Sequence, residues 1–519
     1  MFKTHSSHTQ EDFFSSVNLL PEEKREKLKA SAQWSFYNIV FCHIDENLFS
    51  DLYSEKASRP NAPINVMVGS LILKHHFGWS FEQLFNHIDF DLLTRAALGL
   101  NSLSYSPFAP STIFDFQRRV FEHHLETGNN LFEQVFDAMT KDQLKELGLK
   151  TSIQRTDSVL IASNIRDYSR LQLIIEVLLR VYRILSDADK HTVKEFLAPY
   201  LKHTSGQYCY RLERDAVPHE LELLGTIYHT LIQQFRPAYG DSEIFAVFER
   251  VYTEHFSVAD KTVTLIPATD LSGTILQSPD DPDATYRVKR GESSKGYVLN
   301  AVETAHPDNP INLVVDVCVE PNTTDDSVIL TKRIEKLTDK TPDLDELHSD
   351  ASYGSEANDK ALEEAGITHI QTAVKGRKAA VHMAFAATGE KQWDVTCPKQ
   401  TVKSEPTKKR CKASFNLDVC GTCPFAQQCP AQEQKRCRTL YFTPEDVARN
   451  ARHRNILEIP PERRTLRSNV EATIREFVLR LDGHTISVRG HCKTAFFAFQ
   501  RAASINFGRI FRHQCALNT

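Results

Sequence analysis

The chain is organised around one stretch, Leu344-Asp345-Glu346-Leu347-His348-Ser349-Asp350-Ala351-Ser352-Tyr353-Gly354. Ser355 after it is a helix N-cap residue and Gly366 a helix end, so the sequence predicts a helix between them. Residues 367–374, half apolar and β-branched, predict a strand. Asp350 therefore lies where a strand passes into a loop and helix, the place where open α/β sheets bind ligands. It is either a turn residue bonded to its own backbone or a carboxylate that binds a cation.

The composition is that of an ordinary globular protein. A length of 519 residues allows about three domains, and 41% hydrophobic with 25% charged residues excludes a disordered or fibrous chain. No apolar run approaches the ~20 residues of a membrane span, and the N-terminus lacks the apolar core of a signal peptide. We therefore expect a cytoplasmic protein.

Positive charge is concentrated near the C-terminus. The net charge of −5 argues against a uniformly basic nucleic-acid binder, yet residues 463–512 contain ten Arg/Lys against three acids. Such a patch attracts phosphate backbones, although a solvated helical face can have the same composition.

The apolar spacing predicts a mixed sheet with helices on its faces. In the first 150 residues, helices are expected at 66–77, 81–88 and 111–120, which suits either a helix-turn-helix module or an ordinary helical bundle. Residues 151–160 alternate like a strand with Asp157 near the middle, and residues 169–256 return to helical spacing. Strands are expected again at 285–290, 296–302 and 311–319, followed by a helix at 326–337.

A third acid, Glu471, is expected on a long helix that begins near Arg467. It lies at the edge of an apolar face and one turn from Arg467 and Arg475, so two surface ion pairs of ~0.3–0.5 kcal/mol are one interpretation. The other is a carboxylate directed at the sheet. The apolar face is formed by Val470, Ile474, Phe477 and Leu481.

Asp157, Asp350 and Glu471 together suit a pair of Mg²⁺ ions. Mg²⁺ prefers hard oxygen ligands and keeps several waters, so two or three carboxylates are enough to bind it. Two such ions about 4 Å apart promote phosphodiester displacement.

These segments resemble the bacterial insertion-sequence transposases of the DDE class. Thr156-Asp157-Ser158 with residues 163–171 looks like their first-acid segment, and Ser349-Asp350-Ala351-Ser352-Tyr353-Gly354-Ser355 like their second. Arg467 and Glu471, followed by residues 489–490 and 503–507, look like the third, and residues 63–120 are similar to their N-terminal helical domain. The resemblance implies a ribonuclease H-like core with Asp157, Asp350 and Glu471 as catalytic ligands of two Mg²⁺ ions, or of Mn²⁺. It also implies strand cleavage and transfer on double-stranded DNA.

The sequence departs from a related branch of that family at two places. That branch carries a Tyr one turn before the Arg and a Lys two turns after the Glu, where this chain has Arg464 and Val478. The contacts to DNA ends are therefore expected from other residues, with Arg475 and Arg480 as candidates. The full set of basic residues expected to bind DNA is Arg467, Arg475, Arg480, Arg489 and Lys493.

Six of the eleven cysteines lie between residues 397 and 437. In a reducing compartment such clustering favours metal binding over disulfides. Cys420 and Cys423 have zinc-knuckle spacing, Cys429 follows, and Cys397 is the expected fourth thiolate of a structural zinc site. Cys411 and Cys437 compete for the fourth place, and free thiols or a redox pair are the alternatives. With nine Lys/Arg against three acids between residues 397 and 438, the segment is also suited to DNA contact.

We therefore predict a transposase that acts on the ends of its mobile element as a homodimer, in the bacterial cytoplasm with the nucleoid. The alternatives are a non-catalytic DNA-binding derivative and a metal-dependent nuclease without strand transfer. The predicted segments are a DNA-binding helical domain (1–150), the ribonuclease H-like core (151–168 and 258–390), a helical insert (169–257), a Cys-rich zinc-binding insert (391–445) and C-terminal helices that complete the core (446–519).

Overall fold

The computed structural model describes residues 1–9, 15–54, 56, 59–100, 102, 106–259, 262–289, 291–371, 381 and 383–517. The last part of the strand expected at 367–374, residue 290 and the side chain of Arg464 lie outside this description. No helix among the described residues has the length and apolar character needed to cross a membrane.

The N-terminal module is helical, as expected. Gly78 ends the third helix in a left-handed conformation (φ 72°). Ser80 begins the next one with a capping box, in which its side chain and that of Gln83 each bond the other's backbone N–H. The helices expected at 66–77, 81–88 and 111–120 are confirmed. The module contains α1 (Glu22–Lys29), α2 (Ala32–Ile39), α3 (Ile64–Phe77), α4 (Phe81–Phe90), α5 (Leu92–Ala97), α6 (Pro110–Thr127) and α7 (Leu131–Glu146).

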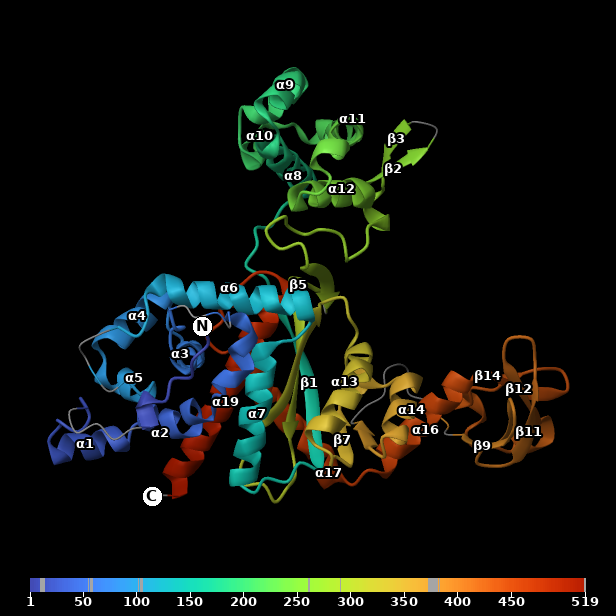
Figure 1. Cartoon of the computed structure of the whole chain (residues 1–519). Helices are drawn as coiled ribbons and strands as arrows, with labels where there is room; N and C mark the ends of the chain where they lie inside the picture. Colours follow the sequence, from blue (N-terminus) through green and yellow to red (C-terminus); the bar gives the residue numbers. More distant parts are fainter. Residues whose placement is uncertain are drawn as a thin grey trace.

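A mixed sheet forms the centre of the chain (Figure 1). The central strand β1 pairs antiparallel with β5 and parallel with β7. Strand β5 also pairs antiparallel with β4 and β6, and β8 lies parallel to β7. The expected mixed sheet is therefore confirmed. Its strands are β1 (Ile153–Ala162), β4 (Thr285–Lys289), β5 (Glu292–Thr304), β6 (Val314–Pro321), β7 (Glu346–Ser349) and β8 (Thr368–Gln371).

Helices cover both faces of this sheet because successive side chains of a strand point to opposite faces. On one face, Leu299 and Ala301 of β5 join a continuous apolar core with the N-terminal helices and α19 (His491–Leu517). On the other, Val302 packs in a separate core with α13 (Asp326–Lys340) and α14 (Glu356–Glu364). Figure 1 shows α7 and α19 on one side of the strands and α13 and α14 on the other.

Two further modules have apolar cores of their own. The expected helical insert follows β1 and projects beyond the end of the sheet (Figure 1). It consists of α8 (Arg170–Ile184), α9 (Asp187–Leu201), α10 (Ser205–Arg211), α11 (Val217–Tyr239), α12 (Glu243–His255) and a hairpin of β2 (Phe256–Ala259) and β3 (Thr262–Leu265).

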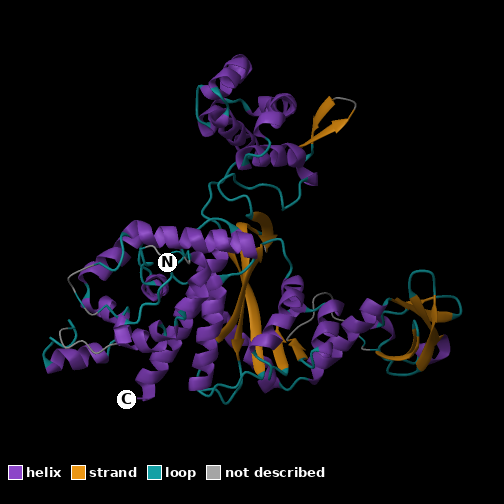
Figure 2. Ribbon diagram, in the orientation of Figure 1, coloured by secondary structure: helices purple, strands orange, loops and turns teal. Residues whose placement is uncertain are grey.

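The Cys-rich segment forms a six-stranded antiparallel sheet separate from the central one (Figure 2). Alternate residues Cys411, Ala413 and Phe415 are buried in its core, with the two-residue period of a strand. We call residues 383–442 the Cys-rich lobe. Its strands are β9 (Ala384–Gly389), β10 (Gln392–Thr396), β11 (Thr401–Pro406), β12 (Cys411–Asn416), β13 (Gln432–Glu433) and β14 (Cys437–Phe442).

The helix that carries Glu471 is shorter than expected. Helix α18 spans Val470–Val478, so Leu481 does not share its apolar face. The chain turns because Arg480 adopts a left-handed conformation (φ 71°) and donates from Nη1 to the carbonyl of His76 at 2.6 Å. Helices α16 (Pro444–Glu458) and α17 (Pro461–Thr465) connect the Cys-rich lobe to α18.

Candidate active site

Asp157, Asp350 and Glu471 line one open groove of about 920 Å³. Asp157 comes from β1, Asp350 follows β7, and Glu471 lies in the first turn of α18. The parallel pairing of β1 with β7 brings the first two together. The structure thus gathers three carboxylates that are separated by 193 and 121 positions in the sequence.

Asp157 is fixed at both carboxylate oxygens. Its Oδ1 accepts the backbone N–H of Ser158 at 2.8 Å, and its Oδ2 accepts from Arg467 Nη2 at 2.9 Å. Burial raises the pKa of Asp157, repulsion from Asp350 and Asp326 adds to that shift, and the Ser158 N–H and Arg467 oppose it. The carboxylate is therefore a costly buried charge that a nearby cation stabilises.

The turn interpretation of Asp350 is confirmed, and its binding of a metal cation stays a prediction. Its Oδ1 accepts the N–H of Ser352 at 2.7 Å and so caps the short 3₁₀ segment Ala351–Tyr353. Its Oδ2 lies 3.9 Å from Arg467 Nη2, on the side of the groove. One oxygen thus fixes the turn while the other faces the neighbouring acids.

Tyr353 anchors the Asp350 loop to the two central strands, and the sequence reasoning missed this residue. Asn300 on β5 donates from Nδ2 to Tyr353 Oη at 2.6 Å, and the same nitrogen donates to the Asp157 carbonyl at 3.1 Å. Tyr353 is buried, and burial raises the pKa of its hydroxyl well above the usual value. The spacing of Asp157 and Asp350 is therefore set by a buried hydrogen-bond network.

Arg467 lies among all three acids. Its Nη2 is 2.9 Å from Asp157 and 3.9 Å from Asp350, and its Nη1 is 3.8 Å from Glu471 Oε1. The Arg467 side chain is 18% exposed, whereas that of Glu471 is 60% exposed. The sequence suggested Arg467 as a DNA contact and an i,i+4 partner of Glu471, but not its place between the acids.

The other basic residues suggested by the sequence lie at different distances from the groove. Arg489 donates from Nε to the carbonyl of Asn164, which lines the groove, at 2.6 Å. Lys493 lies over the ring of Phe121, 5.3 Å from its centroid, and Arg475 is exposed on α18. Only Arg467 of the five lines the groove itself.

A second cavity of about 550 Å³ adjoins the groove, since Asn164 and Thr485 line both. Helix α3 and the turn after it form one wall, and residues 479–487 with α19 form the other. Its cationic residues are Lys74, Arg480 and Arg501.

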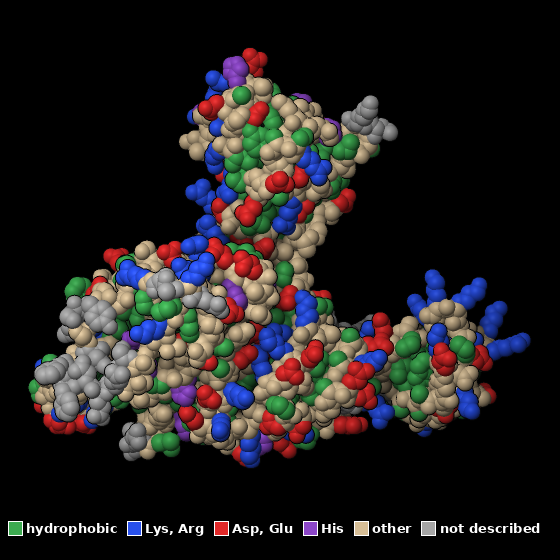
Figure 3. Space-filling model, viewed as in Figure 1, with side chains coloured by type: hydrophobic (Ala, Val, Ile, Leu, Met, Phe, Trp, Pro, Cys, Tyr) green, Lys and Arg blue, Asp and Glu red, His purple; other side chains and the backbone are tan. Residues whose placement is uncertain are grey.

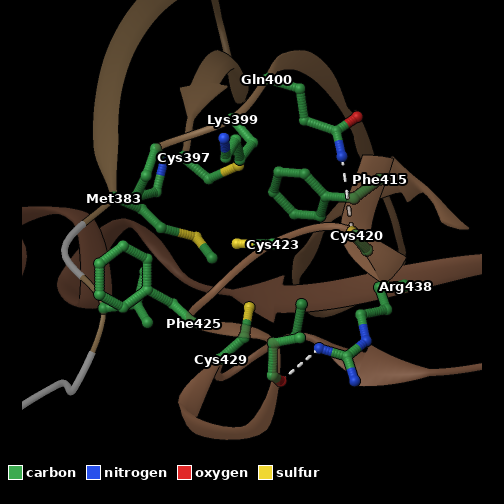
Figure 4. Close-up of a pocket in the computed structure, with 14 residues that line it drawn as sticks. Met383, Cys397, Lys399, Gln400, Phe415, Cys420, Cys423, Phe425, Cys429 and Arg438 are labelled. Atoms are coloured by element: carbon green, nitrogen blue, oxygen red, sulfur yellow. Dashed lines mark hydrogen bonds between the residues drawn. The ribbon is translucent and has the colours of Figure 1, made fainter. Parts of the chain in front are cut away.

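Cys397, Cys420, Cys423 and Cys429 line one small pocket of the Cys-rich lobe (Figure 4). Burial raises the pKa of Cys420, the Arg438 guanidinium opposes that shift, and the other three thiols add to it. Of the two competing cysteines, Cys411 is buried in the core of the lobe. The Sγ of Cys437 forms a hydrogen bond with Thr439 Oγ1 at 3.5 Å. Neither lines this pocket, and none of the eleven cysteines, all of which the structure describes, forms a disulfide.

Within the described ranges, no group of three or more His, Cys, Asp or Glu side chains is arranged to hold a metal ion. Magnesium at the carboxylates and zinc at the thiols therefore stay predictions.

Two family models match the chain. The model described as Transposase DDE domain matches residues 389–511, which include Arg467, Glu471 and most of the Cys-rich lobe. The model described as Transposase domain (DUF772) matches residues 22–119, from α1 into α6. Asp157 and Asp350 lie outside both matched ranges. No curated protein matches the chain.

Proposed function

We propose that this chain, which the two matching family models support as an insertion-sequence transposase of the DDE class, cuts and joins DNA at its own element's ends. It hydrolyses the terminal phosphodiester bond and joins the freed 3′-OH to target DNA. The observation that carries this proposal is the convergence of Asp157, Asp350 and Glu471 on one groove.

The topology supports a ribonuclease H-like core. Strands β6, β5 and β1 are adjacent and antiparallel, and β7 and β8 continue the sheet parallel to β1. In open sheets of this kind, ligands bind beyond the carboxyl ends of parallel strands. Asp350 follows β7 directly at such an end.

The chemical type of the donors suits Mg²⁺, or Mn²⁺ in its place. Asp157, Asp350 and Glu471 offer hard oxygen ligands in an open, polar groove, and these three side chains would hold the ions. When bound, such ions polarise the phosphate and stabilise the charge on its oxygens. The chain's own part is to orient the acids, through the Tyr353 and Asn300 network and the Ser158 and Ser352 N–H groups.

Double-stranded DNA is the proposed substrate and partner. The groove and the adjoining cavity form one route, with Arg467 in the groove and Lys74, Arg480 and Arg501 along the cavity. Helix α3 forms a wall of the cavity that adjoins the groove, so we assign the N-terminal module to reading the element's end. Arg489 lies at the edge of this route, and Arg475 and Lys493 would contact phosphates farther out. Binding through these cations falls steeply with salt.

The Cys-rich lobe gives a second basic surface. Exposed Lys403, Lys408, Lys409 and Arg410 lie on β11 and the turn after it, and Figure 3 shows Lys and Arg side chains projecting from this lobe. We assign it to phosphate contacts as well. A zinc ion held by Cys397, Cys420, Cys423 and Cys429 would stabilise it, because four thiols lining one pocket match the ligands of structural zinc.

The proposal also includes a place and an assembly. A transposase that acts on bacterial chromosomal DNA works in the cytoplasm, on the nucleoid. Two element ends must be handled together, so the active form is a homodimer on DNA.

Two alternatives share part of this description: a metal-dependent nuclease without strand transfer, and a non-catalytic DNA-binding derivative. All three acidic positions are filled, which favours an enzyme over the derivative.

The test uses DNA that carries the ends of the encoding element, a supercoiled plasmid as target, and Mg²⁺. Wild-type protein should cut at the ends and join them to the plasmid, and Asp350→Ala should do neither. Cutting without joining would favour the nuclease, and DNA binding without cutting the inactive derivative. Equal cutting by wild type and Asp350→Ala would overturn the assignment of the acids.

A further inference from the structure

We propose that the Arg467 guanidinium occupies the metal-binding place of the three acids before DNA arrives, and that DNA phosphate then draws it away. Metal binding and DNA binding are therefore positively coupled through one side chain. This inference rests on the proposed function, and it adds a control on when the site accepts metal.

The first step is the position of the guanidinium. The guanidinium of Arg467 is 2.9 Å from the carboxylate of Asp157, whereas it is 3.9 Å from that of Asp350 and 3.8 Å from that of Glu471. It thus forms one direct hydrogen bond and two looser charge contacts. Among the described residues, Arg467 is the cation that lies within 4.0 Å of all three carboxylates.

The second step is electrostatic exclusion. A divalent ion bound to the same oxygens would lie within a few ångströms of the guanidinium. Like charges at that separation repel strongly where the site is partly buried, as Asp157 and Arg467 are. The guanidinium and the ions therefore compete for the acids.

The third step is that the guanidinium can leave. Its Nε is buried and has no hydrogen-bond partner among the described atoms. The present contacts therefore use only part of the guanidinium's hydrogen-bonding capacity. The backbone beside it is fixed separately, because Arg155 Nη1 donates to the carbonyl of Leu466 at 2.7 Å. The side chain can thus move while the backbone at Leu466 stays in place.

DNA supplies a better partner for the released group. The planar guanidinium fork binds phosphate through two parallel hydrogen bonds, and the phosphates of a strand in the groove would lie beside the acids. Because coupling between two ligands is reciprocal, DNA should raise the affinity for metal by the same factor as metal raises the affinity for DNA.

The experiment measures Mn²⁺ affinity of the full chain, by the electron paramagnetic resonance signal of free Mn²⁺, without and with DNA carrying an element end. Arg467→Gln should bind Mn²⁺ about tenfold or more tightly than wild type without DNA, since a nearby positive charge is removed. Wild type should gain affinity when DNA is added, and Arg467→Gln should gain much less. Asp350→Asn should lose most of the Mn²⁺ binding, which places the ion at the acids.

A matched control is Arg452→Gln, which removes an arginine paired with Asp359 outside the groove and should leave Mn²⁺ affinity unchanged. Equal or weaker Mn²⁺ binding by Arg467→Gln would overturn the inference. So would a wild-type Mn²⁺ affinity that DNA does not change, a result that needs no variant to fold. In either case, cleavage that still requires Asp350 would leave the proposed function standing.

Discussion

Arg155 and Glu303 form a buried ion pair beside the acids, with Arg155 Nε 2.6 Å from Glu303 Oε1. Arg155 and Asp157 lie two positions apart on β1 and so point to the same face of the sheet. The other oxygen of Glu303 accepts from Arg509 Nη1 on α19 and from Thr473 Oγ1 on α18, each at 2.6 Å. One carboxylate thus connects β1 to the helix that carries Glu471.

Replacing Glu303 with alanine should lower the free energy of unfolding by about 3–5 kcal/mol, because Arg155 would be left as a buried charge without a carboxylate partner and Arg509 would keep only its pair with Glu476. Chemical denaturation followed by circular dichroism measures the change. The control is Glu122→Gln, which breaks a surface pair with Arg118 and should cost far less. Similar losses for both variants would show that the buried pair does not stabilise the core.

Tyr353→Phe should lower stability by about 1 kcal/mol, since one buried hydrogen bond is removed. The larger effect should be on DNA cleavage, which is expected to fall by roughly tenfold because a small displacement of the Asp350 loop misplaces a catalytic group. Single-turnover cleavage at saturating DNA separates this effect from DNA binding. Tyr441→Phe, an exposed residue in the Cys-rich lobe, is the control. A cleavage rate unchanged by Tyr353→Phe would argue against this positioning role.

Asp157→Asn should become more stable relative to wild type as the pH rises. The pKa of Asp157 is raised in the folded chain, mainly by burial, so its protonated form favours folding. That contribution is present below the unfolded pKa and is lost as the pH rises through the folded pKa.

Melting temperatures from about pH 4 to about pH 8 cover this range. The difference in melting temperature between Asp157→Asn and wild type should increase in favour of the variant as the pH rises. Glu471→Gln changes a side chain that is 60% exposed, so its melting temperature should follow that of wild type more closely. A gap that narrows as the pH rises would contradict the burial of the Asp157 charge.

The purified chain should contain about one zinc ion per molecule, bound in the Cys-rich lobe. Cys423→Ser should lose the metal and lower the melting temperature of the lobe, because a closed thiolate site supplies folding energy. Cys437→Ser should keep the metal, since Cys437 does not line the pocket. Elemental analysis decides the matter, and equal zinc content in wild type and Cys423→Ser would contradict the assignment.

The sequence predicted most elements of the fold because their signals are local. Caps at Ser80 and Ser355 and glycines at 78 and 366 correspond to element boundaries in the structure, and the strand predicted around Asp157 is β1. The end of α18 was not predictable in this way. It depends on a contact between Arg480 and the His76 carbonyl, 404 positions apart.

The candidate site also combines residues that local sequence patterns mark with residues that only long-range contacts bring together. Each acid stands in a recognisable local segment, so the three could be picked from the sequence. The network of Asn300 with Tyr353 and the buried pair of Arg155 with Glu303 join residues 53 and 148 positions apart. No local pattern marks such pairs, and the place of Arg467 among all three acids follows only from the packing of the 3₁₀ turn Leu466–Asn469 and α18 against β1.

The most direct test of the central claim compares DNA cleavage by Asp157→Asn, Asp350→Asn and Glu471→Gln with cleavage by Asp167→Asn, all at saturating DNA and Mg²⁺. Asp167 lines the same groove but pairs with Lys295 at 3.0 Å. If Asp157, Asp350 and Glu471 act as one centre, each of their variants should lose cleavage by about a thousandfold or more while still binding DNA, and Asp167→Asn should stay near wild type. Full cleavage by any of the first three variants would contradict the claim that these acids form one active centre.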